Sequence, residues 1–154
     1  MWNLLKKSKG LSVASPANGK LVDLTSVNDE AFASKAMGDG FAIELEGNKI
    51  YSPVDGEIQV AFPTGHAFGI MSNDVEVLIH IGIDTVNLNG EGFHSVVSVG
   101  NKVKSGDLLV ELDADSLKNK NYDLTTMILF PNNAFEQKNT NGQIKVGDVV
   151  GYAK

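Results

Sequence analysis

The segment VEVLIHIGIDTV, residues 75–86, determines the fold expected for this chain, because its side chains alternate in character along the segment. Every odd-numbered residue from Val75 to Ile83 is aliphatic, as on the core side of a β-strand. The even-numbered residues, which include His80 and Gly82, form the opposite face. We therefore expect a β-strand in which His80 points away from the main core and Gly82 leaves room beside its ring.

Short apolar runs separated by turn residues recur along the rest of the chain, which has sixteen glycines and little sustained helical periodicity. Two internal echoes accompany these runs. ASPANGKL at 14–21 resembles YSPVDGEI at 51–58, and KSGDLL at 104–109 resembles KVGDVV at 145–150. The pattern predicts an all-β sandwich with quasi-symmetric halves.

Helix is expected only as short turns, at residues 28–33 and at residues 113–119, where Asp113 would cap the helix. Residues 1–10 are expected to form a flexible tail, and residues 11–154 a single domain. The mixed apolar and basic start also suits an amphipathic helix on a membrane surface, although we expect any such contact to be weak.

The amino-acid composition limits which binding partners and which cellular compartment we expect for this protein. The chain has no cysteine and hence no disulfide, and it shows neither a secretory signal nor a membrane-spanning apolar stretch, so we expect a cytoplasmic protein. A net charge of −6 argues against nucleic acid as a partner and is compatible with a basic protein. All 13 cationic residues are lysine, so the chain offers no guanidinium to clamp a phosphate.

Two histidines are the strongest candidates for chemistry, because imidazole is the side chain that titrates near neutral pH. Thr64 and His66 lie two residues apart, so in an extended chain the Thr64 hydroxyl would reach Nδ1 of the ring. His66 could then present Nε2 as a donor to an oxyanion, while His80 presents an unprotonated nitrogen as nucleophile. Taken singly, each histidine is as readily explained as an ordinary structural residue.

Five motifs in order carry a family resemblance: GDGFAI at 38–43, SPVDG at 52–56, TGHAFGI at 64–70, HIGIDTV at 80–86 and GEGF at 90–93. Together they resemble the glucose-type IIA component of the bacterial phosphoenolpyruvate:sugar phosphotransferase system. The resemblance extends from about residue 11 to the C-terminus. It implies an antiparallel β-sandwich that works as a monomeric phosphocarrier, without metal or cofactor.

The resemblance also implies roles for individual residues. His80 would accept a phosphoryl group on Nε2 from the phosphohistidine of HPr and pass it to a cysteine of a IIB domain. His66 would contact the phosphoryl group, and Thr64 would orient His66. The carbonyl of Gly82 would hold Nδ1–H of His80. His94 matches no functional position, and we expect it at the surface.

A partner surface follows from the same resemblance. Asp29 and Asp84 match carboxylates that face arginines of HPr and of IIB. Five further residues match an apolar docking ring: Phe32, Met37, Phe62, Leu78 and Val86.

Two other classes of protein remain as alternatives. A lipoyl or biotinyl carrier module shares the turn at 103–109, but this chain lacks the modified-lysine hairpin tip and is much longer. A metallohydrolase would use His66, His80 and Asp84 as a zinc site with an open fourth position.

Overall fold

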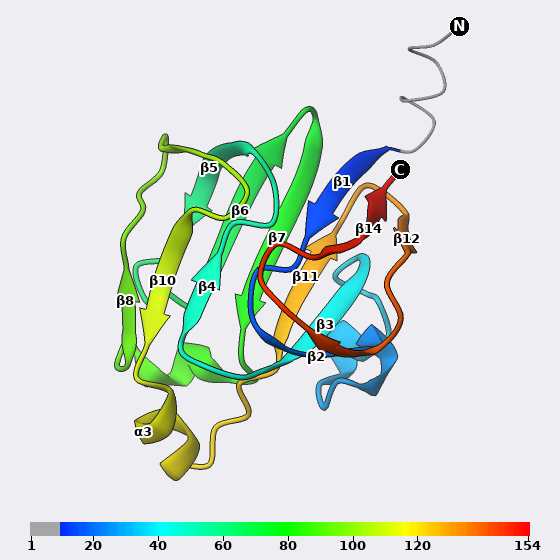
Figure 1. Cartoon of the computed structure of the whole chain (residues 1–154). Helices are drawn as coiled ribbons and strands as arrows, with labels where there is room; N and C mark the ends of the chain where they lie inside the picture. Colours follow the sequence, from blue (N-terminus) through cyan, green and yellow to red (C-terminus); the bar gives the residue numbers. More distant parts are fainter. Residues whose placement is uncertain (1–9) are drawn as a thin grey trace, which may run out of the picture.

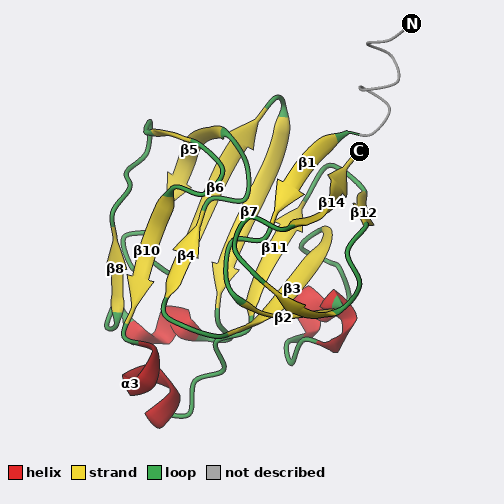
Figure 2. Cartoon of the chain, viewed as in Figure 1, coloured by secondary structure: helices red, strands yellow, loops and turns green. Residues whose placement is uncertain are grey.

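The computed structural model describes residues 10–154, so the expected tail lies outside the described residues except for Gly10. The described residues form a sandwich in which every paired strand is antiparallel, and this confirms the predicted all-β fold. Figures 1 and 2 show a large sheet with two smaller sheets in front of it and short helices near one end.

The large sheet has eight strands, whose spatial order is β13 (Gly142–Ile144), β2 (Gly19–Val22), β3 (Asp39–Leu45), β11 (Thr126–Phe130), β7 (Val75–Ile81), β6 (Ala67–Ser72), β5 (Gly56–Ala61) and β9 (Lys102–Val103). One small sheet consists of β4 (Lys49–Tyr51), β10 (Leu108–Leu112) and β8 (Phe93–Ser95). The other consists of β1 (Leu11–Ala14), β14 (Val149–Ala153) and β12 (Phe135–Gln137).

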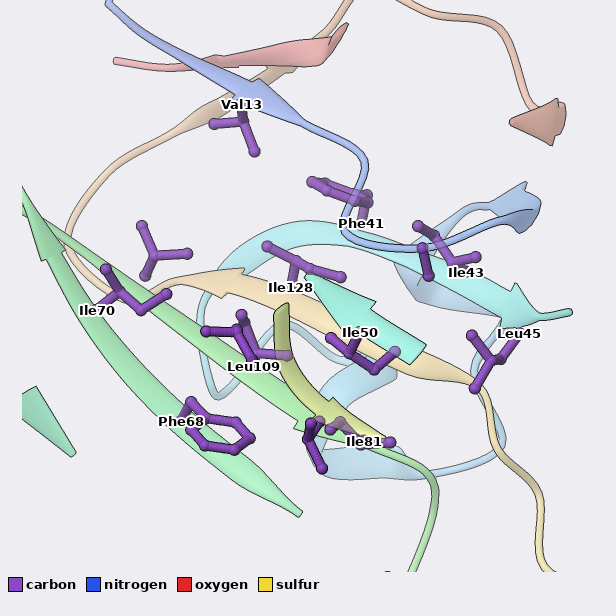
Figure 3. Close-up of a cluster of buried hydrophobic side chains, with 14 of the residues drawn as sticks. Val13, Phe41, Ile43, Leu45, Ile50, Phe68, Ile70, Ile81, Leu109 and Ile128 are labelled. Atoms are coloured by element: carbon purple, nitrogen blue, oxygen red, sulfur yellow. The ribbon is translucent and has the colours of Figure 1, made fainter. Parts of the chain in front are cut away.

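The main core lies between the large sheet and the two small ones. Ile79 and Ile81 of β7 pack there in one cluster with Ile50 of β4 and Leu109 of β10. Each of these side chains is at most 1% exposed, and Figure 3 shows several members of the cluster. Burial of each such side chain contributes about 1.5–3 kcal/mol before the cost in conformational entropy, so the odd-numbered face of β7 anchors the sandwich as its sequence predicts.

The first sequence echo is a true structural repeat. The backbone N–H of Tyr51 donates to the carbonyl of Pro16 at 2.7 Å, and the N–H of Ala14 donates to the carbonyl of Pro53 at 2.9 Å. Each member of the echo thus bonds to the other in the same way. The predicted quasi-symmetry is therefore present, and the two turns stabilise one another across the interface between the halves.

The second echo places an aspartate at the end of each turn. Asp107 accepts a hydrogen bond from the N–H of Lys104 at 2.8 Å, and Asp148 accepts one from the N–H of Lys145 at 3.0 Å. In each case the side chain closes a turn that contains a glycine, Gly106 or Gly147, with positive φ. The same glycine and aspartate positions therefore give the same type of turn in the two halves.

Alternation along β7 ends earlier than the sequence predicts. The strand stops at Ile81, and Gly82 then adopts a φ of +79°, which turns the chain. Ile83 consequently packs in a second apolar cluster with Phe32 and Leu78, on the face that carries His80. The expectation that Ile83 faces the main core was wrong, because the positive φ of glycine resets the alternation of side chains.

Helices are short, as predicted: α2 (Glu30–Ala33), α3 (Ala114–Asn119), and the 3₁₀ turns η1 (Leu24–Ser26) and η2 (Thr85–Leu88). Asp113 precedes α3, but its side chain caps no helix N–H, and its Oδ2 lies instead 3.3 Å from Nε2 of the exposed His94. The expected cap was therefore wrong, whereas the surface position of His94 was right. Within residues 10–154 we find no helix long and apolar enough to cross a bilayer.

Candidate active site

His66 and His80 lie next to each other on the outer face of the large sheet. His80 is in β7 opposite Ala67 of β6, and the carbonyl of His66 accepts a hydrogen bond from the N–H of Ile81 at 2.7 Å. The centroids of the two imidazole rings are 5.2 Å apart, and the ring planes are inclined by 81°. One nitrogen of each ring can therefore contact the same small ligand from a different direction.

The protonation of His80 is set by a single contact. Its Nδ1 lies 3.0 Å from the carbonyl oxygen of Gly82. A carbonyl oxygen can only accept, so Nδ1 carries the hydrogen, and in the neutral ring Nε2 has a free lone pair. His80 is thereby prepared to act as a nucleophile through Nε2.

His66 is held by a hydroxyl instead. Oγ1 of Thr64 lies 2.5 Å from Nδ1 of His66, so the predicted contact is present, but the predicted reason for it was wrong. Residues 63–66 form a turn before β6, in which Gly65 has a φ of +73° and its N–H bonds to the carbonyl of Phe62. A turn, and not an extended chain, brings the hydroxyl to the ring. A hydroxyl that donates to Nδ1 leaves Nε2–H of His66 free to donate to an oxyanion.

Both imidazoles are held in the neutral form. Burial lowers the pKa of His80, and this outweighs the opposing effects of the Gly82 carbonyl and of the nearby Asp29 and Asp84 carboxylates. Burial also lowers the pKa of His66, and repulsion between the two rings when both are protonated lowers it further. At neutral pH both rings therefore keep the tautomers that their hydrogen bonds select.

An aromatic ring lies against each histidine. The ring of Phe32 in α2 is 4.9 Å from that of His80, and the ring of Phe62 is 5.3 Å from that of His66. Phe32 is buried, whereas Phe62 is 47% exposed. The family resemblance assigned both residues to a docking surface, but the sequence analysis missed their contacts with the imidazoles. Strand alternation says nothing about Phe32, which is distant in the chain, and the turn at Gly65 brings Phe62 back against His66.

The remaining residues predicted for docking have different surroundings. Leu78 is half-buried on the His80 face of β7, and Asp84 is exposed at the start of η2. Val86 and Met37 are 49% and 46% exposed, in η2 and in the segment between α2 and β3. Asp29 caps α2 by accepting a hydrogen bond from the N–H of Ala31 at 3.0 Å. Their part in docking stays a prediction.

The alternative zinc site lacks a complete ligand set. Across residues 10–154, no three His, Cys, Asp or Glu side chains come together closely enough to hold a metal ion. His66, His80 and Asp84 therefore do not form the proposed triad in this structure.

Three comparisons with known proteins identify the family of the chain. Residues 11–135 match the family described as phosphoenolpyruvate-dependent sugar phosphotransferase system, EIIA 1. The chain is 42% identical, over 96% of its own length and 97% of the relative's, to the PTS system glucose-specific EIIA component of Mycoplasma capricolum. Its structure resembles that of glucose permease IIA from Mycoplasma capricolum with a TM-score of 0.86 and 43% identity, covering 92% of this chain and 94% of the other.

A longer relative contains a similar domain as one part of a larger protein. The chain is 47% identical over 121 residues to the PTS system glucose-specific EIICBA component of Streptococcus pneumoniae, a match that covers 78% of this chain and 17% of that protein. The family match spans most of the chain, including both histidines and their hydrogen-bond partners. The chain therefore belongs to the EIIA 1 family of the phosphoenolpyruvate-dependent sugar phosphotransferase system.

Proposed function

We propose that this phosphocarrier accepts its phosphoryl group on Nε2 of His80 and that His66 stabilises the group during transfer. The observation that carries the proposal is the hydrogen bond from Nδ1 of His80 to the Gly82 carbonyl, which leaves the Nε2 lone pair free. Nε2–H of His66, oriented by Thr64, supplies a donor for a phosphoryl oxygen.

Each transfer is a displacement at phosphorus. The Nε2 lone pair of His80 attacks the phosphoryl group of phosphohistidine on HPr, the phosphorus–nitrogen bond there breaks, and its electron pair returns to the HPr imidazole. In the second step a cysteine thiolate of IIB attacks, and His80 regains its lone pair. Positioning and charge stabilisation supply most of the catalysis in such transfers.

The partners follow from the family and from the relatives. A IIB domain is the acceptor, since the streptococcal relative carries the A, B and C components in one protein. The family implies HPr as the donor. The names of the relatives suggest that glucose or a related sugar is imported. Phosphoenolpyruvate is a cytoplasmic metabolite, so the relay operates in the cytoplasm.

The docking surface surrounds the histidines. The carboxylates of Asp29 and Asp84 are close enough to oppose in part the lowering of the His80 pKa by burial, and they would face arginines of the partner. The apolar part consists of Phe32, Met37, Phe62, Leu78 and Val86. Because the chain has no arginine, cationic stabilisation of the phosphoryl group by a guanidinium must come from the partner.

The test is phosphorylation in a purified relay. The chain is incubated with phosphoenolpyruvate, Enzyme I and HPr, and intact mass is measured before and after acid treatment. We expect one acid-labile phosphoryl group on the wild type and on His94→Ala, which removes an exposed histidine outside the site, and none on His80→Ala. Absence of phosphorylation in the wild type would contradict the proposal.

A further inference from the structure

The backbone around Gly82 is held from two directions. Within the peptide group that joins Ile81 to Gly82, the carbonyl of Ile81 accepts a hydrogen bond from Oγ1 of Thr85 at 2.5 Å. The N–H of Gly82 donates to the carbonyl of Thr125 at 3.0 Å. Both polar atoms of this peptide group therefore have partners, and the Thr85 side chain is fully buried.

The next peptide group is held in the same manner. Its N–H, from Ile83, donates to the carbonyl of Asp123 at 2.9 Å, and its carbonyl oxygen is the Gly82 atom that faces Nδ1 of His80. The Gly82 carbonyl oxygen, which selects the tautomer of His80, thus belongs to the second of two consecutive peptide groups. Hydrogen bonds hold these two groups to Thr85, Asp123 and Thr125.

Residues 123–125 lie in the loop before β11, where the side chain of Asp123 bonds to Thr125. Oδ1 of Asp123 accepts hydrogen bonds from the backbone N–H of Thr125 at 2.9 Å and from its hydroxyl at 2.7 Å. Asp123 itself is exposed. Its carboxylate therefore holds the loop whose carbonyls accept hydrogen bonds from the N–H groups of Gly82 and Ile83.

Packing leaves the Gly82 backbone little room to shift. A Cβ atom built on Gly82 would lie 2.4 Å from Cγ2 of Thr85 and 3.0 Å from the carbonyl oxygen of Asp123. The same two residues that bond to this segment therefore also enclose it.

We propose that Thr85 and Asp123 are positioning residues that fix the Gly82 carbonyl and thereby keep His80 in the tautomer with Nδ1–H and a free Nε2. Their importance for phosphoryl transfer rests on the proposed role of His80, whereas the effect on the tautomer is independent of that role. Neither residue touches the imidazole, and both act through the backbone of Gly82.

Loss of the Thr85 hydroxyl leaves a buried carbonyl without a partner, and such groups are costly. We expect the Ile81–Gly82 peptide group to shift toward another donor, and the adjoining Gly82 carbonyl to move with it, away from Nδ1. His80 then populates the tautomer with hydrogen on Nε2, which has no lone pair for attack there.

The main experiment compares Thr85→Val, which keeps the shape and loses the hydroxyl, with Thr85→Ser, which keeps the hydroxyl. Ser15→Ala is the control, because Ser15 is also buried and its hydroxyl donates to the Ala17 carbonyl at 2.7 Å, in a turn that makes no hydrogen bond with Gly82 or with residues 123–125. The ¹⁵N shifts of the His80 ring report the tautomer above its pKa, with no partner present. Single-turnover transfer from phospho-HPr reports the rate.

We expect Thr85→Val to increase the fraction of Nε2–H tautomer and to slow acceptance by about tenfold or more. Thr85→Ser and Ser15→Ala should keep the wild-type tautomer. An unchanged tautomer in Thr85→Val, or an equal change in Ser15→Ala, would overturn the proposal. If the tautomer shifts in Thr85→Val but even the wild type accepts no phosphoryl group, the positioning role is supported and the proposed phosphoryl transfer is contradicted.

Substitution of Asp123 gives a second test. Because Asp123 is exposed, its variants should fold even if the buried Thr85→Val substitution disrupts folding. Asp123→Asn retains the acceptor oxygen and should leave the tautomer unchanged, whereas Asp123→Ala removes it and should shift the tautomer in the same direction as Thr85→Val. Equal spectra for the two variants would contradict a role for Asp123.

Discussion

The two imidazoles differ in the kind of oxygen that meets Nδ1. The Gly82 carbonyl can only accept, so it makes Nδ1 of His80 a donor and Nε2 a nucleophile. The Thr64 hydroxyl can also donate, so it allows Nε2 of His66 to carry hydrogen toward an oxyanion. The two histidines, whose ring centroids are 5.2 Å apart, are thus oriented for different roles, His80 as a nucleophile and His66 as a hydrogen-bond donor.

Replacement of His66 by glutamine should separate the two halves of the relay. We expect His66→Gln to accept a phosphoryl group from HPr, because the nucleophile is intact, but to pass it to IIB about 10²-fold more slowly, because the oriented donor is lost. Single-turnover measurements of each half-reaction check this. Equal losses in acceptance and donation would refute the division of roles.

The histidines should also make stability depend on pH. Their pKa values are lowered in the folded protein, so below the ordinary value of about 6.5 the unfolded chain binds more protons. The contribution to stability is full above about pH 6.5 and is lost as pH falls through the lowered pKa values. Urea unfolding between about pH 5 and 6.5, above most carboxyl titration, should show this slope.

The double variant His66→Gln with His80→Gln provides the control for that slope. Removal of both titrating rings should flatten the dependence of the free energy of unfolding on pH in this window. A slope equal to that of the wild type would show that other groups cause it.

Among the secondary-structure elements, β7 shows what alternation can and cannot predict. The buried face of Val77, Ile79 and Ile81 and the outward direction of His80 follow from a period of two. The position of Ile83 does not, because a glycine fits both a strand and a turn, and only the long-range bonds to residues 123–125 select the turn. The pairing of β7 with β11 likewise joins segments far apart in the sequence.

Helix α2 provides a test that separates capping from charge. Asp29→Asn keeps the oxygen that accepts from Ala31, so the free energy of unfolding should be unchanged, whereas Asp29→Ala should lower it by about 1 kcal/mol. Both variants lose the charge and should bind HPr more weakly. Chemical unfolding and titration calorimetry measure the two effects, and equal stability of Asp29→Ala and Asp29→Asn would contradict the capping role.

For the molecule as a whole, local patterns predicted the architecture better than the site. Each half repeats a proline turn and an aspartate-closed glycine turn, and both were visible as echoes because turn chemistry is local. The contact of Phe32 with His80 and the support of Gly82 by Thr85 and residues 123–125 were not visible. They depend on how separate elements meet, which a linear pattern does not specify.

The overall charge predicts the salt dependence of the proposed transfer from HPr. With a net charge of −6 and carboxylates beside His80, the chain should be steered electrostatically toward the arginines that the proposal places on its partner. Raising the salt from about 0.1 M to about 1 M shortens the Debye length from about 10 Å to about 3 Å, and should lower the second-order rate constant of phosphoryl transfer about tenfold. Rapid-quench kinetics at each salt concentration measure this rate.

Paired charge variants locate the origin of that effect. Asp84→Asn should flatten the salt dependence, because Asp84 lies beside His80. Asp74→Asn makes the same change in net charge at the opposite end of β7, six residues or about 20 Å from His80, in a turn position with positive φ that asparagine tolerates. It should leave most of the dependence in place. If both variants flatten the slope equally, net charge and not the carboxylate at the site governs the encounter with HPr.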